Sequence, residues 1–360
     1  MREPKSLADI FITELEPGDG IRLAVKDLFD TAGVRTTYGS AVFAEHVPRE
    51  TAEAVSRLER SGYTSVGKTN LHEFAYGVTS QNLHYGTVPN PTYPGCTAGG
   101  SSGGSAAALA AGLADAALGT DTGGSIRIPA ACCAVVGFKP SYGLVSTEGV
   151  FPLAPSFDHA GPMARDVATC AAMMRVLADV DAADVALGDL AIATSWGADS
   201  PVAATPIEFP TAEDVSPAFM REVADVHREL YAENADLYGE NVSPKIERCL
   251  QVVDSEVEAA AALREAYCET MRETIDPFDL LVTPTLGFVA PRDDVNELEV
   301  REAMISRTYP FNLLGWPALA LPCGPAEDGL PASIQLVGRP GDDALVLAAG
   351  LALEAVLRPR

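Results

Sequence analysis

The sequence predicts an α/β fold. Short apolar segments of strand length alternate along the chain with longer segments whose apolar residues recur at helical spacing. The chain has 360 residues, a length that suits one large domain or two ordinary ones. Hydrophobic residues make up 47% and charged residues 21% of the chain, which is typical of a globular protein with a substantial core.

The predicted elements follow from local patterns. Residues 21–29 alternate and then run apolar, which indicates a strand, and this strand carries Lys26. Residues 105–114 are almost all alanine, the best helix former. Ser216 and Pro217 resemble an N-cap followed by a first-turn proline. The other predicted strands are 63–67, 116–119, 133–138, 280–283, 318–321 and 332–337, and the other predicted helices are 51–61, 165–177, 255–275 and 342–357.

Charge and cysteine content exclude several classes of protein. The formal net charge is −25, and so acidic a chain repels nucleic-acid backbones and anionic membranes. No apolar run is long enough to span a bilayer, and the N-terminal residues contain no apolar signal core. The odd number of cysteines, seven, predicts free thiols in a reducing compartment, and no spacing suggests a metal site. We expect a soluble cytoplasmic protein without metal or cofactor.

Two glycine-serine segments, 97–105 and 119–125, carry the chemical signal. They lack the lysine of a phosphate-binding loop. Gly99, Ser101 and Gly103 match a nucleophile elbow, but no histidine follows at the required late position. A flexible linker is disfavoured because apolar sequence follows at once. The remaining interpretation is a serine activated by a neutral lysine, and the candidate base is Lys26 in its apolar strand. Lys68 is interpreted instead as an exposed loop charge or a structural ion pair.

The same residues resemble the amidase signature family of serine amidohydrolases. The central matches are residues 99–108 (GGSSGGSAAA), 119–127 (GTDTGGSIR) and 137–143 (GFKPSYG). Flanking matches are 24–27 (AVKD), 66–75 (VGKTNLHEFA), 157–163 (FDHAGPM), 280–285 (LLVTPT) and 329–338 (GLPASIQLVG). The resemblance covers most of the chain and implies a single large amidase domain over 1–360, with a mixed twisted β-sheet covered by helices.

The resemblance also implies a triad of a serine, a cis-serine and a lysine. Carried over by motif, Ser125 is the nucleophile, Ser101 relays the proton and Lys26 is the base. The expected oxyanion hole comprises the backbone N–H groups of Thr122, Gly123, Gly124 and Ser125. Such a lysine accepts a proton only when neutral, so its pocket must lower its pKa.

Other polar residues near the triad are interpreted as supports. Ser102 is expected to hydrogen-bond behind the site, and Ser105 to cap the alanine helix. Asp121 and Arg127 flank the nucleophile, and an ion pair between them would hold its loop.

Two segments depart from the family pattern. The stretch before Lys26 lacks the usual helical lead, and residues 186–212 look like a contraction of a strand–helix–strand unit. Composition also makes 180–212 the best internal boundary. We hypothesise that these shortened segments leave a more open site that admits bulkier amides.

The leading functional hypothesis is a stand-alone amidase acting on a small-molecule amide, with esters or carbamates as side substrates. The alternative is the glutaminase subunit of a tRNA-dependent amidotransferase, and a non-catalytic binding relative is disfavoured by the intact triad. Family members of the amidotransferase type use an arginine and an aspartate to hold glutamine. Approximate placement puts Lys245 or Pro244, and Ile305, at those positions. No direct nucleic-acid or membrane partner is expected, and a homodimer is left open.

Overall fold

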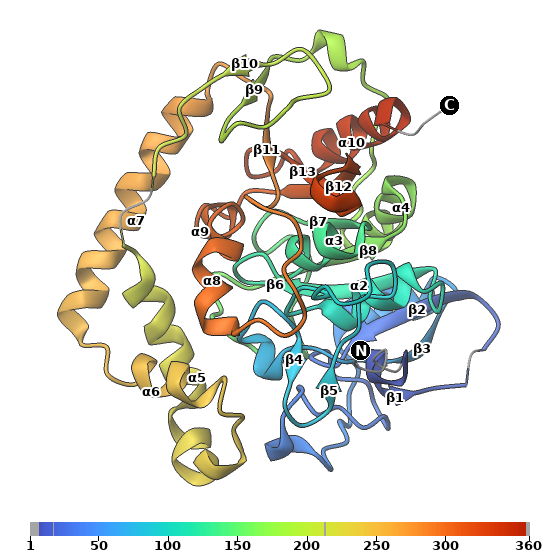
Figure 1. Cartoon of the computed structure of the whole chain (residues 1–360), viewed down its shortest axis with the longest axis vertical. Coiled ribbons are helices and arrows are strands. Elements are labelled where there is room, and N and C mark those ends of the chain that lie inside the picture. The colour runs from blue at the N-terminus through green and yellow to red at the C-terminus, as the bar shows by residue number, and fades with distance from the viewer. Residues whose placement is uncertain (1–6, 17, 212–213, 358–360) are drawn as a thin grey trace.

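A computed structural model describes residues 7–16, 18–211 and 214–357 (Figure 1). In this part of the chain an 11-stranded sheet runs in the order β1-β3-β2-β6-β8-β7-β12-β13-β11-β9-β10. Its strands are β1 (Phe11–Glu14), β2 (Ile21–Lys26), β3 (Tyr63–Thr69), β6 (Ala116–Asp121), β7 (Val136–Lys139), β8 (His159–Ala164), β9 (Ile192–Thr194), β10 (Thr205–Pro206), β11 (Leu280–Pro284), β12 (Ala318–Pro325) and β13 (Pro331–Val337). A separate hairpin pairs β4 (Gln81–Asn82) with β5 (Gly86–Thr87).

The sheet is mixed, and its parallel part positions the site. β2 lies between β3 and β6 and is parallel to both, whereas β6 is antiparallel to β8. All six residues of β6 are buried, because helices cover both faces of the sheet here. Parallel strands end at the same edge, so Lys26 at the end of β2 lies beside the end of β6.

Helices pack on both faces of the sheet. One face, with Leu23 and Val25, is covered by α1 (Glu53–Arg60), α4 (Val167–Ala178) and α10 (Asp343–Leu357). The other face, with Ala24, is covered by α2 (Gly103–Ala110) and α3 (Arg127–Cys133). Alanines and glycines dominate α2, so this helix approaches the strands closely.

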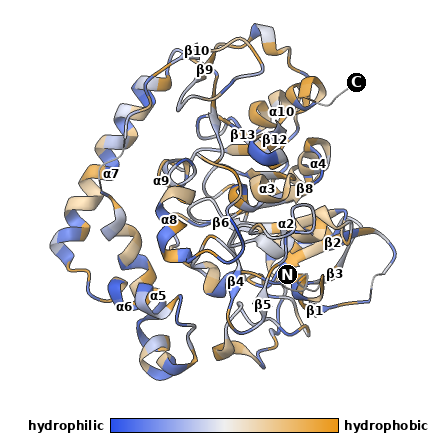
Figure 2. Ribbon diagram, viewed as in Figure 1, coloured by the Kyte–Doolittle hydropathy of each residue, from blue (hydrophilic) through white to orange (hydrophobic). Residues whose placement is uncertain are grey.

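The remaining helices lie at one side of the sheet. They are α5 (Ser216–Asn234), α6 (Ser243–Cys249), α7 (Asp254–Ile275), α8 (Glu297–Ile305) and α9 (Tyr309–Leu313). In Figure 1, α5, α6 and α7 form an outer layer, with α8 and α9 between it and the sheet. α7 mixes hydrophilic and hydrophobic residues, as expected for a helix with one solvent-facing side (Figure 2). Single 3₁₀ turns are formed by Leu7–Ile10, Ala41–Phe43, Glu73–Ala75, Leu187–Asp189, Ala235–Leu237 and Glu327–Gly329.

The predicted α/β class and single large domain are confirmed, but several local predictions were wrong. The internal boundary expected within 180–212 does not divide the chain, because Ile192–Thr194 joins the main sheet as β9. The contraction expected at 186–212 is not among the wrong predictions, since residues 195–204, all described, contain no helix between β9 and β10. The strand expected at 133–138 begins only at Val136, because Cys133 ends α3. β8 was missed, because its glycine, proline and alanines are poor strand formers and its position between β6 and β7 decides its conformation.

Other features agree with expectation. All seven cysteines have free thiols. Among the described residues, none of the helices combines the length and the apolar character that crossing a membrane requires.

Candidate active site

The candidate site begins at Lys26, the last residue of β2. Its side chain is 0% exposed. Its Nζ donates hydrogen bonds of 2.7 Å to the Ser101 hydroxyl and 2.7 Å to the Thr120 hydroxyl. The peptide bond between Gly100 and Ser101 is cis. The parallel pairing of β2 with β6 brings Lys26 to Thr120, and the loop before α2 supplies Ser101.

Burial changes the acidity of Lys26. Desolvation lowers the pKa of the ammonium group from its ordinary value to about 7, against the opposing charges of Asp121 and Asp158. A substantial fraction of this lysine is therefore neutral near neutral pH, so its amine can accept a proton.

Ser125 lies in the turn between β6 and α3 and lines a cavity. It is 6% exposed, and its carbonyl accepts a 3.2 Å hydrogen bond from the N–H of Ser102. Within the described chain, no hydrogen bond joins the hydroxyls of Ser125 and Ser101. The structure thus brings Lys26 and Ser101 into direct contact and seats Ser125 beside them through the backbone of Ser102.

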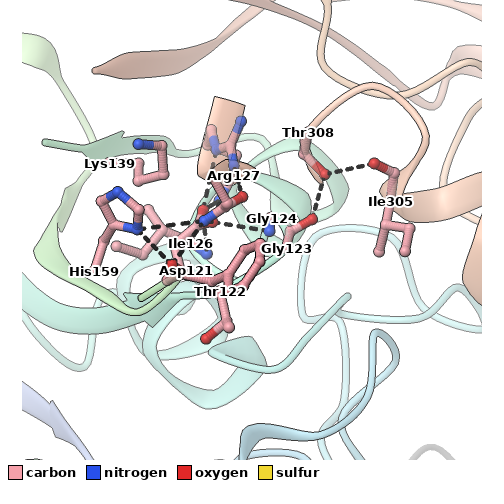
Figure 3. Close-up of polar contacts among 12 residues, drawn as sticks. Asp121, Thr122, Gly123, Gly124, Ile126, Arg127, Lys139, His159, Ile305 and Thr308 are labelled. Atoms are coloured by element: carbon pink, nitrogen blue, oxygen red, sulfur yellow. Dashed lines mark hydrogen bonds and ion pairs between the residues drawn. The ribbon is translucent and has the colours of Figure 1, made fainter. Parts of the chain in front are cut away.

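A buried ion pair supports the turn that carries Ser125. Arg127 approaches both carboxylate oxygens of Asp121, at 2.9 Å and 3.0 Å, and both side chains are 0% exposed. The same carboxylate accepts the N–H groups of Gly124 at 2.8 Å and Ile126 at 3.1 Å (Figure 3). Burial alone would raise the pKa of Asp121, but the charge and hydrogen bonds of Arg127 outweigh it and hold that pKa below its usual range. The predicted ion pair is confirmed.

These contacts correct the expected oxyanion hole at Gly124. Its N–H donates to Asp121, so it is not available to a substrate in this structure. The N–H groups of Gly123 and Ser125 donate to no acceptor in the described part of the chain. Thr122 lines the cavity, and its hydroxyl donates to Asp158 at 2.6 Å.

The C-terminal half of the chain closes onto the same turn. The Thr308 hydroxyl donates a 2.7 Å hydrogen bond to the Gly123 carbonyl (Figure 3). Gly124 has a φ of +131°, and an added Cβ would lie 2.2 Å from the Thr308 hydroxyl oxygen. Glycine is therefore required at 124 both by backbone conformation and by this close approach.

Two serines near Ser101 have different roles from each other. The Ser102 hydroxyl donates to the Thr120 carbonyl at 3.2 Å and accepts from the Thr120 N–H at 3.3 Å, which confirms it as a supporting hydrogen-bonder. The prediction that Ser105 caps the helix was wrong, because α2 already begins at Gly103. Ser105 instead donates to the Leu118 carbonyl at 2.9 Å and ties α2 to β6.

Lys68 is buried in β3 rather than exposed in a loop, which corrects that part of its prediction. Its Nζ lies 3.6 Å from a carboxylate oxygen of Asp27 and donates to the Thr36 hydroxyl at 2.7 Å and to the Phe29 carbonyl. Desolvation lowers its pKa to about 8. The structural ion pair is confirmed.

The cavity above Ser125 has a volume of about 540 Å³. Its walls come from residues 75–78, the turn at 122–125, and helices α5, α6, α8 and α9. Sequence reasoning missed the lining residues Phe219, Arg301 and Tyr309, because no local motif marks them and only packing brings their helices to Ser125.

The positions that the resemblance places at glutamine recognition meet this cavity in part. Lys245 lines it and forms a 3.0 Å ion pair with Glu297, and Ile305 lines it close to Gly123. Pro244 is exposed and does not line it.

Comparison with known proteins gives consistent results over nearly the whole chain. The model of the family described as Amidase matches residues 12–253 and 214–347. The chain is 34% identical to a glutamyl-tRNA(Gln) amidotransferase subunit of Haloarcula marismortui, over 94% of this chain and 95% of that protein. It is 32% identical to a 1-carboxybiuret hydrolase subunit of Pseudomonas sp. (strain ADP), over 94% of this chain and 84% of that protein.

A solved structure described as an amidase superposes with a TM-score of 0.85 and 36% identity, covering 94% of this chain and 85% of that one. Family model, relatives and fold agree over the segments that form the candidate site. The chain belongs to the Amidase family.

Proposed function

We propose that this chain is an amidase that hydrolyses a small-molecule amide to a carboxylate and ammonia or an amine, through an acyl-enzyme on Ser125. Membership of the family makes it a hydrolase of amide C–N bonds. The proposed mechanism on Ser125 rests mainly on the buried Lys26. Its pKa is lowered to about 7, and its Nζ lies 2.7 Å from the Ser101 hydroxyl.

In the first step Ser125 attacks the amide carbonyl carbon. Its hydroxyl proton passes to Ser101, which in turn gives its own proton to neutral Lys26. This transfer requires the Ser125 hydroxyl to turn toward Ser101, a change of side-chain rotamer. Lys26 then carries the proton as an ammonium, hydrogen-bonded to Ser101 and Thr120.

The tetrahedral intermediate places negative charge on the former carbonyl oxygen. The backbone N–H groups of Gly123 and Ser125 are the proposed donors to this oxygen, and the support is that neither has an acceptor among the described residues. Thr122 precedes Gly123 in the chain and also lines the cavity, and its backbone N–H is the remaining donor of the proposed oxyanion hole.

Collapse of the intermediate breaks the C–N bond. The proton held by Lys26 returns through Ser101 to the leaving nitrogen, which departs as ammonia or an amine. Water then attacks the acyl-enzyme with the same base, which releases the carboxylate and restores the Ser125 hydroxyl. The cavity of about 540 Å³ is of a size that takes substrates larger than the simplest amides.

The alternative is a subunit of a tRNA-dependent amidotransferase, which the name of the Haloarcula relative favours. That role predicts glutaminase activity that depends on partner subunits. Hydrolysis of simple amides by the isolated chain supports the stand-alone amidase instead.

The test of the nucleophile uses a fluorophosphonate probe and the Ser125→Ala variant. We expect the probe to label Ser125 in the wild-type chain, and Ser125→Ala to lose both labelling and amide hydrolysis. Ser102→Ala is the matched control, since it removes a neighbouring hydroxyl and should still be labelled. Label on another residue, or full activity in Ser125→Ala, would contradict the proposal.

A further inference from the structure

Three cationic side chains line the cavity above Ser125, and they differ in how they are compensated. Lys245 forms its 3.0 Å ion pair with buried Glu297. Arg248 is exposed at the cavity mouth, where its charge helps, after the hydrogen bonds from Ser216, to lower the pKa of Asp214. Arg301 has no carboxylate within ion-pair distance among the described residues.

Arg301 also has unused hydrogen-bonding capacity. Its Nε is buried and has no acceptor in the described chain. Its guanidinium lies over the ring of Tyr76, 5.3 Å from the ring centroid, and this contact does not neutralise its charge. An uncompensated, partly buried guanidinium in a cavity is a binding site for a planar anion, and carboxylates fit it in a bidentate geometry.

The carboxylate one helical turn away does not compensate Arg301. Glu297 lies one helical turn earlier in α8, but one of its oxygens accepts from Lys245 at 3.0 Å and the other from the Val78 N–H at 3.3 Å. Two further carboxylates, Asp214 and Glu302, line the cavity, but among the described residues neither lies within ion-pair distance of Arg301. Arg301 is therefore a lining cation without an ion-pair partner.

The position of α8 sets the distance between this charge and the reacting carbonyl. The C-terminal end of α8 meets the nucleophile turn, where a Cβ on Gly123 would lie 4.0 Å from the Ile305 side chain. Arg301 is four residues earlier, which is about 6 Å along a helix axis. Three or four carbon–carbon bonds cover this span, and the Ile305 and Phe219 side chains offer apolar walls for the methylenes between.

We propose that the substrate is an amide whose acyl group ends in a carboxylate, and that Arg301 binds this carboxylate. The class is the monoamides of dicarboxylic acids with about four or five carbons. This inference rests on the proposed function, because it assumes that the amide carbonyl reacts at Ser125. Arg301 contacts the far end of the substrate and determines specificity.

The test compares glutaramate with pentanamide, two five-carbon amides that differ in the terminal carboxylate. The measurement is kcat/KM for each amide, and the readout is the ratio between them. A charge-assisted contact of this kind contributes about 1.5–3 kcal/mol, so the wild-type ratio should favour glutaramate by about 10- to 150-fold. In Arg301→Met the ratio should fall to about one, and Arg301→Lys should restore part of it.

Arg272→Met is the matched control, because Arg272 is an exposed helical arginine that does not line the cavity. Its ratio should equal that of the wild type. Calorimetry with glutarate adds a readout without turnover, and binding should be lost in Arg301→Met. Circular dichroism confirms that each variant is folded.

The outcomes separate the two proposals. Equal kcat/KM for both amides in the wild type, or a ratio that falls in Arg248→Met but not in Arg301→Met, overturns the role of Arg301 and leaves the amidase function standing. Failure of the wild type to hydrolyse any amide, glutaramate included, overturns the proposed function and this inference with it.

Discussion

Lys26 shows how one buried side chain sets the pH range of the proposed chemistry. Desolvation lowers its pKa to about 7, and the proposed base works only in the neutral form. We therefore expect kcat/KM to rise with pH, to reach half its maximum near pH 7, and to fall about tenfold per pH unit below that. The measurement is the pH profile of kcat/KM with a neutral amide. The residual rate of Lys26→Met should show no inflection near pH 7, and a wild-type inflection near the ordinary lysine value would contradict the assignment.

Asp121 and Arg127 form a fully buried ion pair behind the nucleophile turn. Arg127→Met leaves a fully buried carboxylate without its cation, so we expect the free energy of unfolding to fall by about 3–5 kcal/mol. Urea unfolding followed by circular dichroism measures this. The matched control is Arg22→Met, which breaks the partly exposed pair of Arg22 with Asp115 and should cost at most about 1 kcal/mol. Equal losses in the two variants would show that burial does not govern the contribution of the pair.

At the scale of elements, the close approach of α2 to the sheet holds Ser101 and Ser102 in place. The Gly104 N–H donates to the Asn70 carbonyl at 3.0 Å, and a Cβ on Gly104 would lie 2.3 Å from that oxygen. A backbone atom cannot move aside as a flexible side chain can, so Gly104→Ala must displace α2.

We expect Gly104→Ala to lower the free energy of unfolding by about 1–3 kcal/mol, and to lower kcat as the loop before α2 shifts. Denaturant titration and steady-state kinetics measure the two effects. Gly188→Ala is the control, because Gly188 is exposed and nothing lies within 4 Å of its added Cβ. If Gly104→Ala were as stable and active as Gly188→Ala, the packing of α2 would not position the site.

At the scale of the whole molecule, the net charge of −25 opposes compaction. Salt screens repulsion between surface carboxylates, since the Debye length falls from about 30 Å at 0.01 M to about 8 Å at 0.15 M. We expect Tm to rise as sodium chloride increases over this range, as measured by differential scanning calorimetry. Choline chloride at equal ionic strength should give the same rise, because screening does not depend on the cation. A Tm that is constant or falls would contradict this account.

The fold class and the family were predictable because they depend on local patterns and motifs. The apolar strand that carries Lys26 predicted β2, and the alanine run predicted α2 to within a few residues at each end. The ion pair of Asp121 and Arg127 was predictable because six residues separate them across one tight turn. β8 was not, because its small residues carry no strand signal and its neighbours in the sheet determine its conformation.

The sequence by itself determined that the protein is α/β and that its motifs resemble the amidase signature family, and it singled out Lys26 as a lysine within an apolar strand. The tertiary structure alone decided that Lys26 contacts Ser101 and Thr120, that the N–H of Gly124 is taken by Asp121, and that Arg301 faces the cavity over Ser125. The physical reason is the separation along the chain between the groups that interact. Strand and helix patterns are read within a few residues, whereas hydrogen bonds, burial and pKa shifts depend on groups that only the folded chain brings together.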